Sequence, residues 1–341
     1  MRMNKVYIIA EMSANHCGDI DIAKKIIAAA KDIGADAVKL QTYTPDTITL
    51  DCQSDVFKIS GNSPWDGRYM YDVYKEAQTP WEWHLELKNY ADQLGIELFS
   101  TPFDYSAVDF LESIGVNSYK IASFEAIDFP LIKYTASKQK PTIISVGISS
   151  LEEIQEAIDT CKSVGNEDIT ILKCTSSYPA KLEDMNLLTI KDMVERFVPQ
   201  GVKIGLSDHT LNVETAITAT ALGATVIERH LTLDRDFGGE DEAFSSNVEE
   251  FKQMVDSVRN TEKLLGKVDY SVNIANRRGA RSLFVVKDIK AGEVFTKENV
   301  KSIRPNNGLE PRYYDDLIGK VALLDLKKGT PLSFELIGDK S

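Results

Sequence analysis

The feature that most constrains the fold of this 341-residue chain is an alternation of short apolar runs with longer amphipathic stretches. The runs are short and apolar throughout, as expected of strands buried on both faces of a parallel sheet. Parallel strands need a crossover between them, and an amphipathic helix can supply it. We predict eight strands, at residues 6–10, 37–40, 96–99, 118–121, 142–146, 169–172, 202–204 and 225–227.

The stretches between these runs have the apolar periodicity of surface helices. Several end at a glycine, which favours the left-handed conformation found after a helix C-terminus. Eight such units over about 265 residues match the usual size of a TIM (β/α)8 barrel, the fold class that we predict. A doubly wound open sheet is the alternative, but no G-x-G-x-x-G motif follows the first run. The predicted helices are 21–33, 83–94, 106–114, 150–163, 187–197, 213–222 and 247–265.

The sequence changes character after the last predicted barrel helix. Residues 266–278 are polar and irregular, and residues 279–341 carry short β-prone runs and glycine-bearing turns but no long helical pattern. A β-rich module of this size would be marginally stable alone, so we expect it to pack on a barrel. We predict a barrel domain over 1–270, a linker over 271–280 and a small β-rich domain over 281–341.

Composition argues against several classes of partner. The net charge of −13 repels nucleic acid and anionic lipid, so an anionic substrate needs a local basic pocket. The longest apolar runs are too short to span a membrane, and residues 1–10 lack the length of a secretory signal. The four cysteines are scattered, which favours free thiols over a disulfide framework or a zinc ribbon. We expect a cytoplasmic protein that binds neither nucleic acid nor a membrane.

Two histidines stand at the carboxyl ends of consecutive predicted strands, His209 after GLSD and His230 after VIER. In a TIM barrel, chemistry is assembled at this end of the strands. Two imidazoles on neighbouring strands can bind one divalent metal and leave positions open for water and a substrate oxygen. The structural alternative is a pair of hydrogen-bonded core histidines.

Polar side chains recur at the carboxyl ends of the other strands, where packing alone would favour branched apolar residues. Lys39 and Lys120, together with neighbouring hydroxyl groups, offer donors suited to a phosphate and a carboxylate, as in a phosphoenolpyruvate site. The hydroxyl groups are those of Thr101, Ser123, Ser145, Ser176 and Ser207.

Three further charged residues are candidates. Glu125 can act as a general acid/base or accept a hydrogen bond from a sugar hydroxyl, and the alternative is a solvated loop carboxylate. Asp241 follows two glycines after the eighth strand, where a solvated turn is the alternative. Arg304, in the run RPNNG, is a fixed cation on a rigid loop of the small domain, with an ordinary surface position as the alternative.

Six ordered motifs carry a more specific resemblance. They are residues 10–16 (AEMSANH), 38–42 (VKLQT), 99–103 (FSTPF), 119–125 (YKIASFE), 205–209 (GLSDH) and 227–230 (IERH). Together they resemble the sialic acid synthase family, and the likeness covers the whole chain. The tail, through RPNNG, is similar to the C-terminal antifreeze-like (SAF) domain of that family.

This resemblance implies a metal-dependent condensation of phosphoenolpyruvate with an open-chain N-acetylated sugar, which releases phosphate and gives a nine-carbon 2-keto acid. By motif, Lys39, Lys120 and the five hydroxyl residues above would hold phosphoenolpyruvate. His209 and His230 would hold Mn²⁺, with Mg²⁺ or Co²⁺ as alternatives.

The resemblance also assigns the sugar side of the site. Gln41, Glu125, Tyr178 and Asp241 would face the sugar. Arg304 would reach the acetamido group of the sugar in the partner subunit's barrel, because family members are domain-swapped homodimers. The partners implied are therefore phosphoenolpyruvate, an N-acetylated deoxy sugar and a second copy of the chain.

Several segments are more similar to a branch of the family that acts on a deoxy, diacetamido sugar than to the N-acetylneuraminate branch. Cys17 stands where the N-acetylneuraminate branch commonly has Glu, and a small thiol tolerates a deoxy sugar. Ser176 replaces the Asn of the family and is a shorter donor. We expect 2,4-diacetamido-2,4,6-trideoxy-L-altrose as the sugar. The segments are residues 43–50, 65–68, 79–84 and 243–245.

Three other functions stay open at this point. An N-acetylneuraminate or legionaminic acid synthase would use another N-acetylated hexose. A carbohydrate-binding protein without catalysis would need neither phosphate-binding lysines nor strand-end histidines. A barrel lyase that runs a pyruvate aldol reaction would need a Schiff-base lysine.

Overall fold

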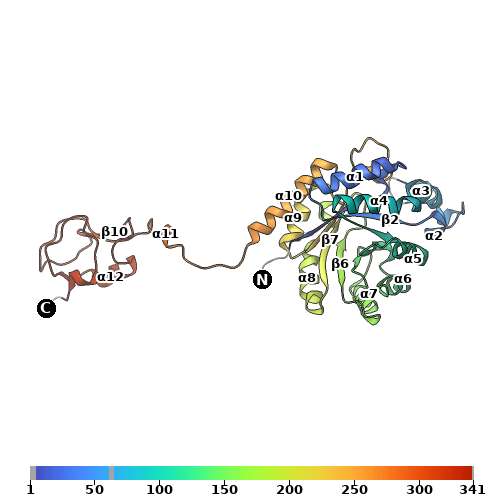
Figure 1. Ribbon diagram of the computed structural model, residues 1–341. Coiled ribbons are helices and arrows are strands. Elements are labelled where there is room, and N and C mark those ends of the chain that lie inside the picture. Colours follow the sequence, from blue (N-terminus) through green and yellow to red (C-terminus); the bar gives the residue numbers. More distant parts are fainter. Residues whose placement is uncertain (1–4, 61–64, 340–341) are drawn as a thin grey trace. The chain divides into compact units, whose positions relative to one another are not determined.

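The computed structural model describes residues 5–60 and 65–339, and the chain divides into two compact units, Met1–Lys267 and Val268–Ser341. The first unit is a closed barrel of eight parallel strands in sequential order (Figure 1). Closure comes from the pairing of β1 with β8, which sets Glu11 opposite His230. An open doubly wound sheet would end in two edge strands, whereas this sheet has none, so the predicted TIM barrel is confirmed. The strands are β1 (Tyr7–Glu11), β2 (Ala37–Thr42), β3 (Glu97–Pro102), β4 (Tyr119–Ile121), β5 (Thr142–Ser145), β6 (Ile169–Cys174), β7 (Lys203–Asp208) and β8 (Val226–His230).

Helices between the strands surround the barrel (Figure 1). Two of the longer helices begin with a capping box, in which Ser150 and Asn247 each exchange hydrogen bonds with a glutamate three residues later. The helix α6 was not predicted, because its eight residues are too few to show a clear periodicity. No helix in the described ranges is both long enough and apolar enough to cross a membrane. The helices are α1 (Ile20–Asp32), α4 (Trp81–Leu94), α5 (Tyr105–Ser113), α6 (Phe129–Ala136), α7 (Leu151–Ser163), α8 (Leu188–Phe197), α9 (Val213–Ala221) and α10 (Val248–Leu265).

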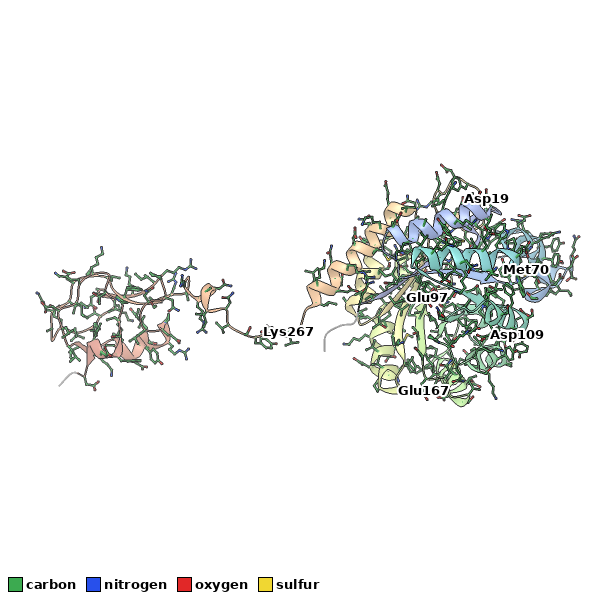
Figure 2. All side chains as sticks on the ribbon, in the orientation of Figure 1. Asp19, Met70, Glu97, Asp109, Glu167 and Lys267 are labelled. Carbon is green, nitrogen blue, oxygen red and sulfur yellow. The ribbon has the colours of Figure 1, made fainter. Side chains whose placement is uncertain are left out.

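The connection between β2 and α4 is a long excursion that contains two further helices. They are α2 (Pro45–Ile48) and α3 (Met70–Ala77), and Met70 is labelled in Figure 2. Neither helix was predicted from the sequence. We call residues 43–77 the β2–α4 excursion.

Alternation along the strands sorts the side chains of the barrel into two sets. One set faces the helices and joins the large core between barrel and helices. The other set points into the barrel, where its lower members form an apolar floor. The floor is made by Ile9, Ala37, Phe99, Ile143, Leu172 and Val226.

The second unit is small and β-rich, with a separate hydrophobic core that includes Leu283, Val285, Phe295 and Leu332. Residues 266–278 were expected to be irregular, but they contain one turn of helix, α11, since the Asn273 side chain caps it by accepting from the Ala275 N–H. The elements of this unit are α11 (Ile274–Arg277), β9 (Ser282–Val285), β10 (Val300–Ile303), α12 (Tyr314–Leu317), β11 (Val321–Ala322) and β12 (Ile337–Gly338).

Candidate active site

Polar residues lie directly above the apolar floor, because every second residue toward the carboxyl end of a strand also points into the barrel. Lys39 is two residues beyond Ala37, Glu228 two beyond Val226, and Ser207 pairs in register with Glu228. The same alternation turns Asp208, Arg229 and other strand-end residues toward the helices. The inward set is Glu11, Lys39, Gln41, Thr101, Lys120, Ser145, Cys174, Ser207, His209, Glu228 and His230.

Four buried charges form the lowest polar layer. Lys39 is ion-paired with Glu11 and lies 3.8 Å from Glu228 Oε1, and Lys120 Nζ lies 3.6 Å from the same oxygen. Ser207 Oγ donates to Glu228 Oε1 at 3.2 Å. The predicted lysine pair is therefore together, as the sequence indicated. Its two carboxylate partners were not predicted as site residues, although Glu11 and Glu228 stand inside the quoted motifs.

Two opposing effects set the pKa values of the carboxyl groups in this layer: burial raises them, and the nearby lysine charges lower them. Burial raises the pKa of Glu11 to about 7, although Lys39 opposes the shift. Burial raises the pKa of Glu228 as well, but Lys120 and Lys39 outweigh it and hold that pKa below its usual value. Burial also lowers the pKa of Lys120. A protonated Glu11 would leave the layer with a net positive charge, which suits an anionic ligand.

Hydroxyl groups surround the lysines. Thr101 Oγ1 accepts from Lys39 Nζ at 3.2 Å, and the Ser145 hydroxyl is buried with no hydrogen-bond partner among the described residues. Ser176 Oγ donates to Ser123 Oγ at 2.8 Å. Although Ser176 is shorter than the Asn expected in the family, it reaches the Ser123 hydroxyl. All five predicted hydroxyl residues therefore belong to this part of the barrel.

Gly147, just beyond β5, makes room for these hydroxyls. Its backbone N–H donates to Ser123 Oγ at 2.8 Å. A Cβ atom at this position would lie 2.3 Å from Ser176 Oγ and 2.8 Å from Ser123 Oγ, closer than real atoms approach. A residue with a side chain would therefore fill the space between the hydroxyls. Gly147 was not predicted as a site residue.

His209 and His230 lie side by side at the carboxyl ends of β7 and β8, with ring centroids 5.5 Å apart. His209 Nδ1 lies 3.0 Å from the carbonyl oxygen of Thr175. Since a carbonyl only accepts, Nδ1 carries a hydrogen and leaves a lone pair on Nε2 of the neutral ring. Burial would lower the pKa of His209, but Cys174 and the Thr175 carbonyl raise it, so a metal would compete with a proton for Nε2.

His230 also suits a metal. Its Nδ1 is buried and has no hydrogen-bond partner among the described residues. Burial, followed by the charges of His209, Lys39 and Lys120, lowers the pKa of His230 well below its usual value, so the ring is neutral. No cluster of three or more His, Cys, Asp or Glu in metal-binding geometry occurs among the described residues. The pair therefore fits a divalent ion whose remaining ligands are water and substrate oxygens.

The other two histidines are structural. His16 Nε2 donates to Thr79 Oγ1 at 3.1 Å, since its Nδ1 accepts from the Gly18 N–H, and His84 Nε2 lies 2.8 Å from Thr42 Oγ1. Burial lowers the pKa of each to about 4. Both are therefore hydrogen-bonded core histidines, which was the structural alternative for His209 and His230.

A cavity of about 270 Å³ opens above the buried charges, and its wall includes five predicted residues. Glu125 Oε2 is buried without a hydrogen-bond partner among the described residues, and burial raises the pKa of Glu125 to about 7. Gln41 donates to Ser13 Oγ at 2.9 Å, and Ser13 donates to Asp241. The predicted residues in the wall are Gln41, Glu125, Tyr178, Asp241 and His230.

One residue, Cys17, differs from its expected surroundings, and one part of the cavity wall was not expected. Cys17 is not among the described residues that line the cavity, and its thiol donates to Glu242 Oε1 at 3.3 Å. Cys17 therefore lies outside this cavity wall. The β2–α4 excursion contributes much of the cavity wall, including Trp65, although no residue within it was predicted as a site residue.

Arg304 belongs to the second unit. It is exposed, and its loop is anchored by Ser282, whose hydroxyl donates to the Pro305 carbonyl at 2.7 Å and accepts from the N–H groups of Asn307 and Gly308. A Cβ atom on Gly308 would lie 2.5 Å from the Leu283 carbonyl, so only glycine allows this close approach. The expected fixed cation on a rigid loop agrees with this geometry.

Behind the histidines, a buried ion pair joins the ends of β7 and β8. Arg229 pairs with Asp208, and both side chains are fully buried. Asp208 also accepts from the Thr210 N–H at 2.9 Å and from Thr215 Oγ1 at 2.5 Å. Arg229 donates to the Asn212 carbonyl at 2.6 Å. Since each partner precedes a site histidine, this network fixes the backbone that carries both rings.

Comparison with known proteins agrees with this geometry. The NeuB family model matches residues 26–270, and the SAF domain model matches residues 280–337. The chain is 47% identical over 331 residues to the pseudaminic acid synthase of Campylobacter jejuni serotype O:2, covering 96% of this chain and 95% of that protein. It is also 47% identical over 330 residues to the pseudaminic acid synthase of Helicobacter pylori, covering 96% of each.

A crystal structure of N-acetylneuraminic acid synthetase from Leptospira borgpetersenii matches with a TM-score of 0.71 and 30% identity, over 80% of this chain and 90% of that one. The family model and the relatives each cover more than two thirds of the chain. The chain therefore belongs to the NeuB family, as its resemblance to sialic acid synthases predicted.

Proposed function

We propose that this protein condenses phosphoenolpyruvate with 2,4-diacetamido-2,4,6-trideoxy-L-altrose and water to give pseudaminic acid and phosphate. A bond forms between C3 of phosphoenolpyruvate and the aldehyde carbon of the sugar, water adds at C2, and the C2–O bond to phosphate breaks. One observation carries the proposal: two buried lysines lie beneath a cavity whose wall holds a site histidine and the unpaired carboxyl group of Glu125. A sugar-binding protein without catalysis would need neither lysine.

Phosphoenolpyruvate binds in the lower layer. Lys39 and Lys120 attract its phosphate and carboxylate, and Thr101, Ser123, Ser145, Ser176 and Ser207 donate hydrogen bonds to them. The unpaired Ser145 hydroxyl and the space beside Gly147 support this assignment. These donors are held in place before the ligand arrives, which reduces the entropic cost of binding it.

The sugar binds above, against Gln41, Tyr178 and Asp241. Because burial raises the pKa of Glu125 to about 7, a large fraction of this carboxyl group is protonated at neutral pH, and the protonated form donates to the oxygen of the sugar aldehyde. His209 and His230 hold a divalent cation, for which we propose Mn²⁺, and that ion supplies a Lewis acid for the aldehyde.

We also propose that the active form is a domain-swapped homodimer, with residues 271–280 as the linker. Arg304 of one protomer then binds the acetamido group of the sugar in the barrel of its partner. Alternate apolar residues at the start of the second unit support an interface there: Val268 is 86%, Tyr270 93% and Ile274 82% exposed. Exposed apolar surface of this kind is typical of contact regions.

A phosphate-release assay tests the substrate. Purified protein with phosphoenolpyruvate and Mn²⁺ is given the L-altro sugar, a stereoisomer of that diacetamido sugar, and N-acetylmannosamine. We expect kcat/KM for the L-altro sugar to exceed the other two values by at least about tenfold, which is about 1.4 kcal/mol of discrimination. Turnover of N-acetylmannosamine alone would reject the proposal, and the Lys120→Ala variant is the inactive control.

A further inference from the structure

The β2–α4 excursion forms an apolar wall of the cavity that the proposed mechanism does not use. Ile48, Ile59, Trp65 and Val73 line the cavity from this excursion. Hydrocarbon side chains gain free energy by contact with methyl groups but cannot pair with hydroxyl groups. The wall therefore favours the parts of a sugar that lack hydroxyls.

Trp65 contacts two aromatic rings of the cavity but, among the described residues, has no ring contact with either histidine. Its ring centroid is 6.5 Å from that of Tyr178 and 6.2 Å from that of Phe244. Those two rings in turn contact the histidines, with centroids 4.3 Å apart for Tyr178 and His209 and 5.1 Å apart for Phe244 and His230. Tyr178 and Phe244 therefore link Trp65 to the two histidines.

The indole N–H of Trp65 is an unused donor. Its Nε1 atom is shielded from solvent and has no hydrogen-bond partner among the described residues. A buried tryptophan N–H usually has a partner, and leaving it without one costs about 1–3 kcal/mol. A ligand that places an acceptor there recovers this free energy.

Hydrogen bonds of Gly67 and Arg68 hold the backbone just after Trp65. Backbone hydrogen bonds join Ile59 to Arg68 (2.8 Å) and Gly67 to Ile59 (2.8 Å). Arg68 donates to Glu240 at 2.7 Å and to Glu76 at 2.6 Å, which ties the excursion to the loop that carries Asp241. The backbone that follows Trp65 is therefore held in place before a ligand binds.

We infer that Trp65 recognises the acetamido group at C4 of the sugar, an inference that rests on the proposed function. The indole N–H donates to the acetamido carbonyl oxygen, and Ile48 and Ile59 contact the methyl groups. When C1 lies at the histidines, a substituent at C2 stays beside them, whereas a substituent at C4 is two carbons farther out, on the side of Trp65. A hydroxyl at C4 would lack both the carbonyl acceptor and the apolar methyl.

The test compares Trp65→Phe with the wild type on two sugars that differ only at C4. One is the 2,4-diacetamido sugar, and the other carries a hydroxyl in place of the 4-acetamido group. Phenylalanine keeps an aromatic ring but removes the N–H, so we expect kcat/KM for the diacetamido sugar to fall about tenfold. The loss with the 4-hydroxy analogue should be no more than about twofold, and KM for phosphoenolpyruvate should not change.

Trp83→Phe is the matched control, since Trp83 lies on α4 and is not among the described residues that line the cavity. It should leave the ratio of the two sugars unchanged. Equal losses on both sugars, or no loss on either, in Trp65→Phe would overturn the inference while the proposed function stands. If the wild type does not turn over the diacetamido sugar, the proposed function and the inference both fail.

Discussion

At the scale of single residues, the histidine pair gives the most direct prediction. His209→Ala or His230→Ala removes one of two protein ligands, so we expect Mn²⁺ affinity to fall at least about 100-fold and turnover to be lost. Calorimetric titration with Mn²⁺ and the phosphate-release assay measure these two effects. Melting temperatures near that of the wild type would show that the barrel remains folded. Full activity in both variants, unaffected by chelator, would contradict the metal assignment.

Gly147→Ala tests the space between the hydroxyl groups. The added carbon would lie 2.3 Å from Ser176 Oγ, so the hydroxyls must move apart and we expect KM for phosphoenolpyruvate to rise at least about tenfold. The matched control is Gly279→Ala, whose added carbon has its nearest neighbour at 3.8 Å. Steady-state kinetics on both variants measure the difference, and equal KM values would argue against the assignment.

Glu125→Gln tests the raised pKa of this carboxyl group. Because the pKa of Glu125 is about 7 when folded and 4.5 ordinarily, the folded wild type holds a proton that the unfolded chain releases between these values. The wild type should therefore lose stability relative to Glu125→Gln as pH rises from 5 to 8, by no more than about 3 kcal/mol. Melting curves of the wild type and of Glu125→Gln at pH 5 and at pH 8 measure this difference in stability. A difference that does not vary with pH would contradict the shift, and turnover should fall in Glu125→Gln at all pH values.

Single residues could be predicted wherever strand position alone decides the direction of a side chain. Lys39, Lys120, His209 and His230 stand at the ends of predicted strands, and alternation brings them into one barrel interior. Their ion-pair partners are also at strand ends, but a sequence does not show which opposite charges meet. The role of Gly147 depends on side chains from two other strands, so no local pattern reveals it.

At the scale of elements, the eight strands were predicted because buried parallel strands read as apolar runs. Most extend farther at the carboxyl end than predicted, as β7 does to Asp208, because their last residues are polar. These polar residues line the active site. The residues that made the predicted strands too short are therefore the ones that carry the chemistry. The β2–α4 excursion could not be predicted, since its short helices have too few turns for a periodic signal.

The ion pair between Asp208 and Arg229 belongs to the scale of elements because it joins β7 to β8. Asp208→Ala leaves a buried guanidinium without its charge partner, and we expect the free energy of unfolding to fall by about 3–5 kcal/mol. Asp192→Ala is the control, since it breaks an ion pair to Arg196 in which both side chains are 51% exposed, worth less than about 1 kcal/mol. All three tryptophans lie in the barrel, so urea unfolding followed by tryptophan fluorescence reports on the barrel. Equal losses in the two variants would contradict the prediction.

At the scale of the whole molecule, a complementation experiment tests the swapped dimer. We expect Arg304→Ala and Lys120→Ala chains to be inactive separately, because one lacks the arginine and the other the lysine. In a mixed swapped dimer, one barrel receives both residues, so random mixing should restore about a quarter of wild-type activity. Two different affinity tags, one on each variant, and purification on both tags in turn verify that mixed dimers form. No recovery in verified mixed dimers would reject the swap.

The apolar floor of the barrel has a consequence for the order of events in catalysis. Ile9, Phe99 and Leu172 belong to the cluster that seals the end opposite the cavity, so molecules enter and leave through the same opening. The ligand bound at the lysines then lies behind the one bound beside Glu125. We expect compulsory ordered kinetics, with phosphoenolpyruvate arriving first and phosphate trapped until the nine-carbon acid departs.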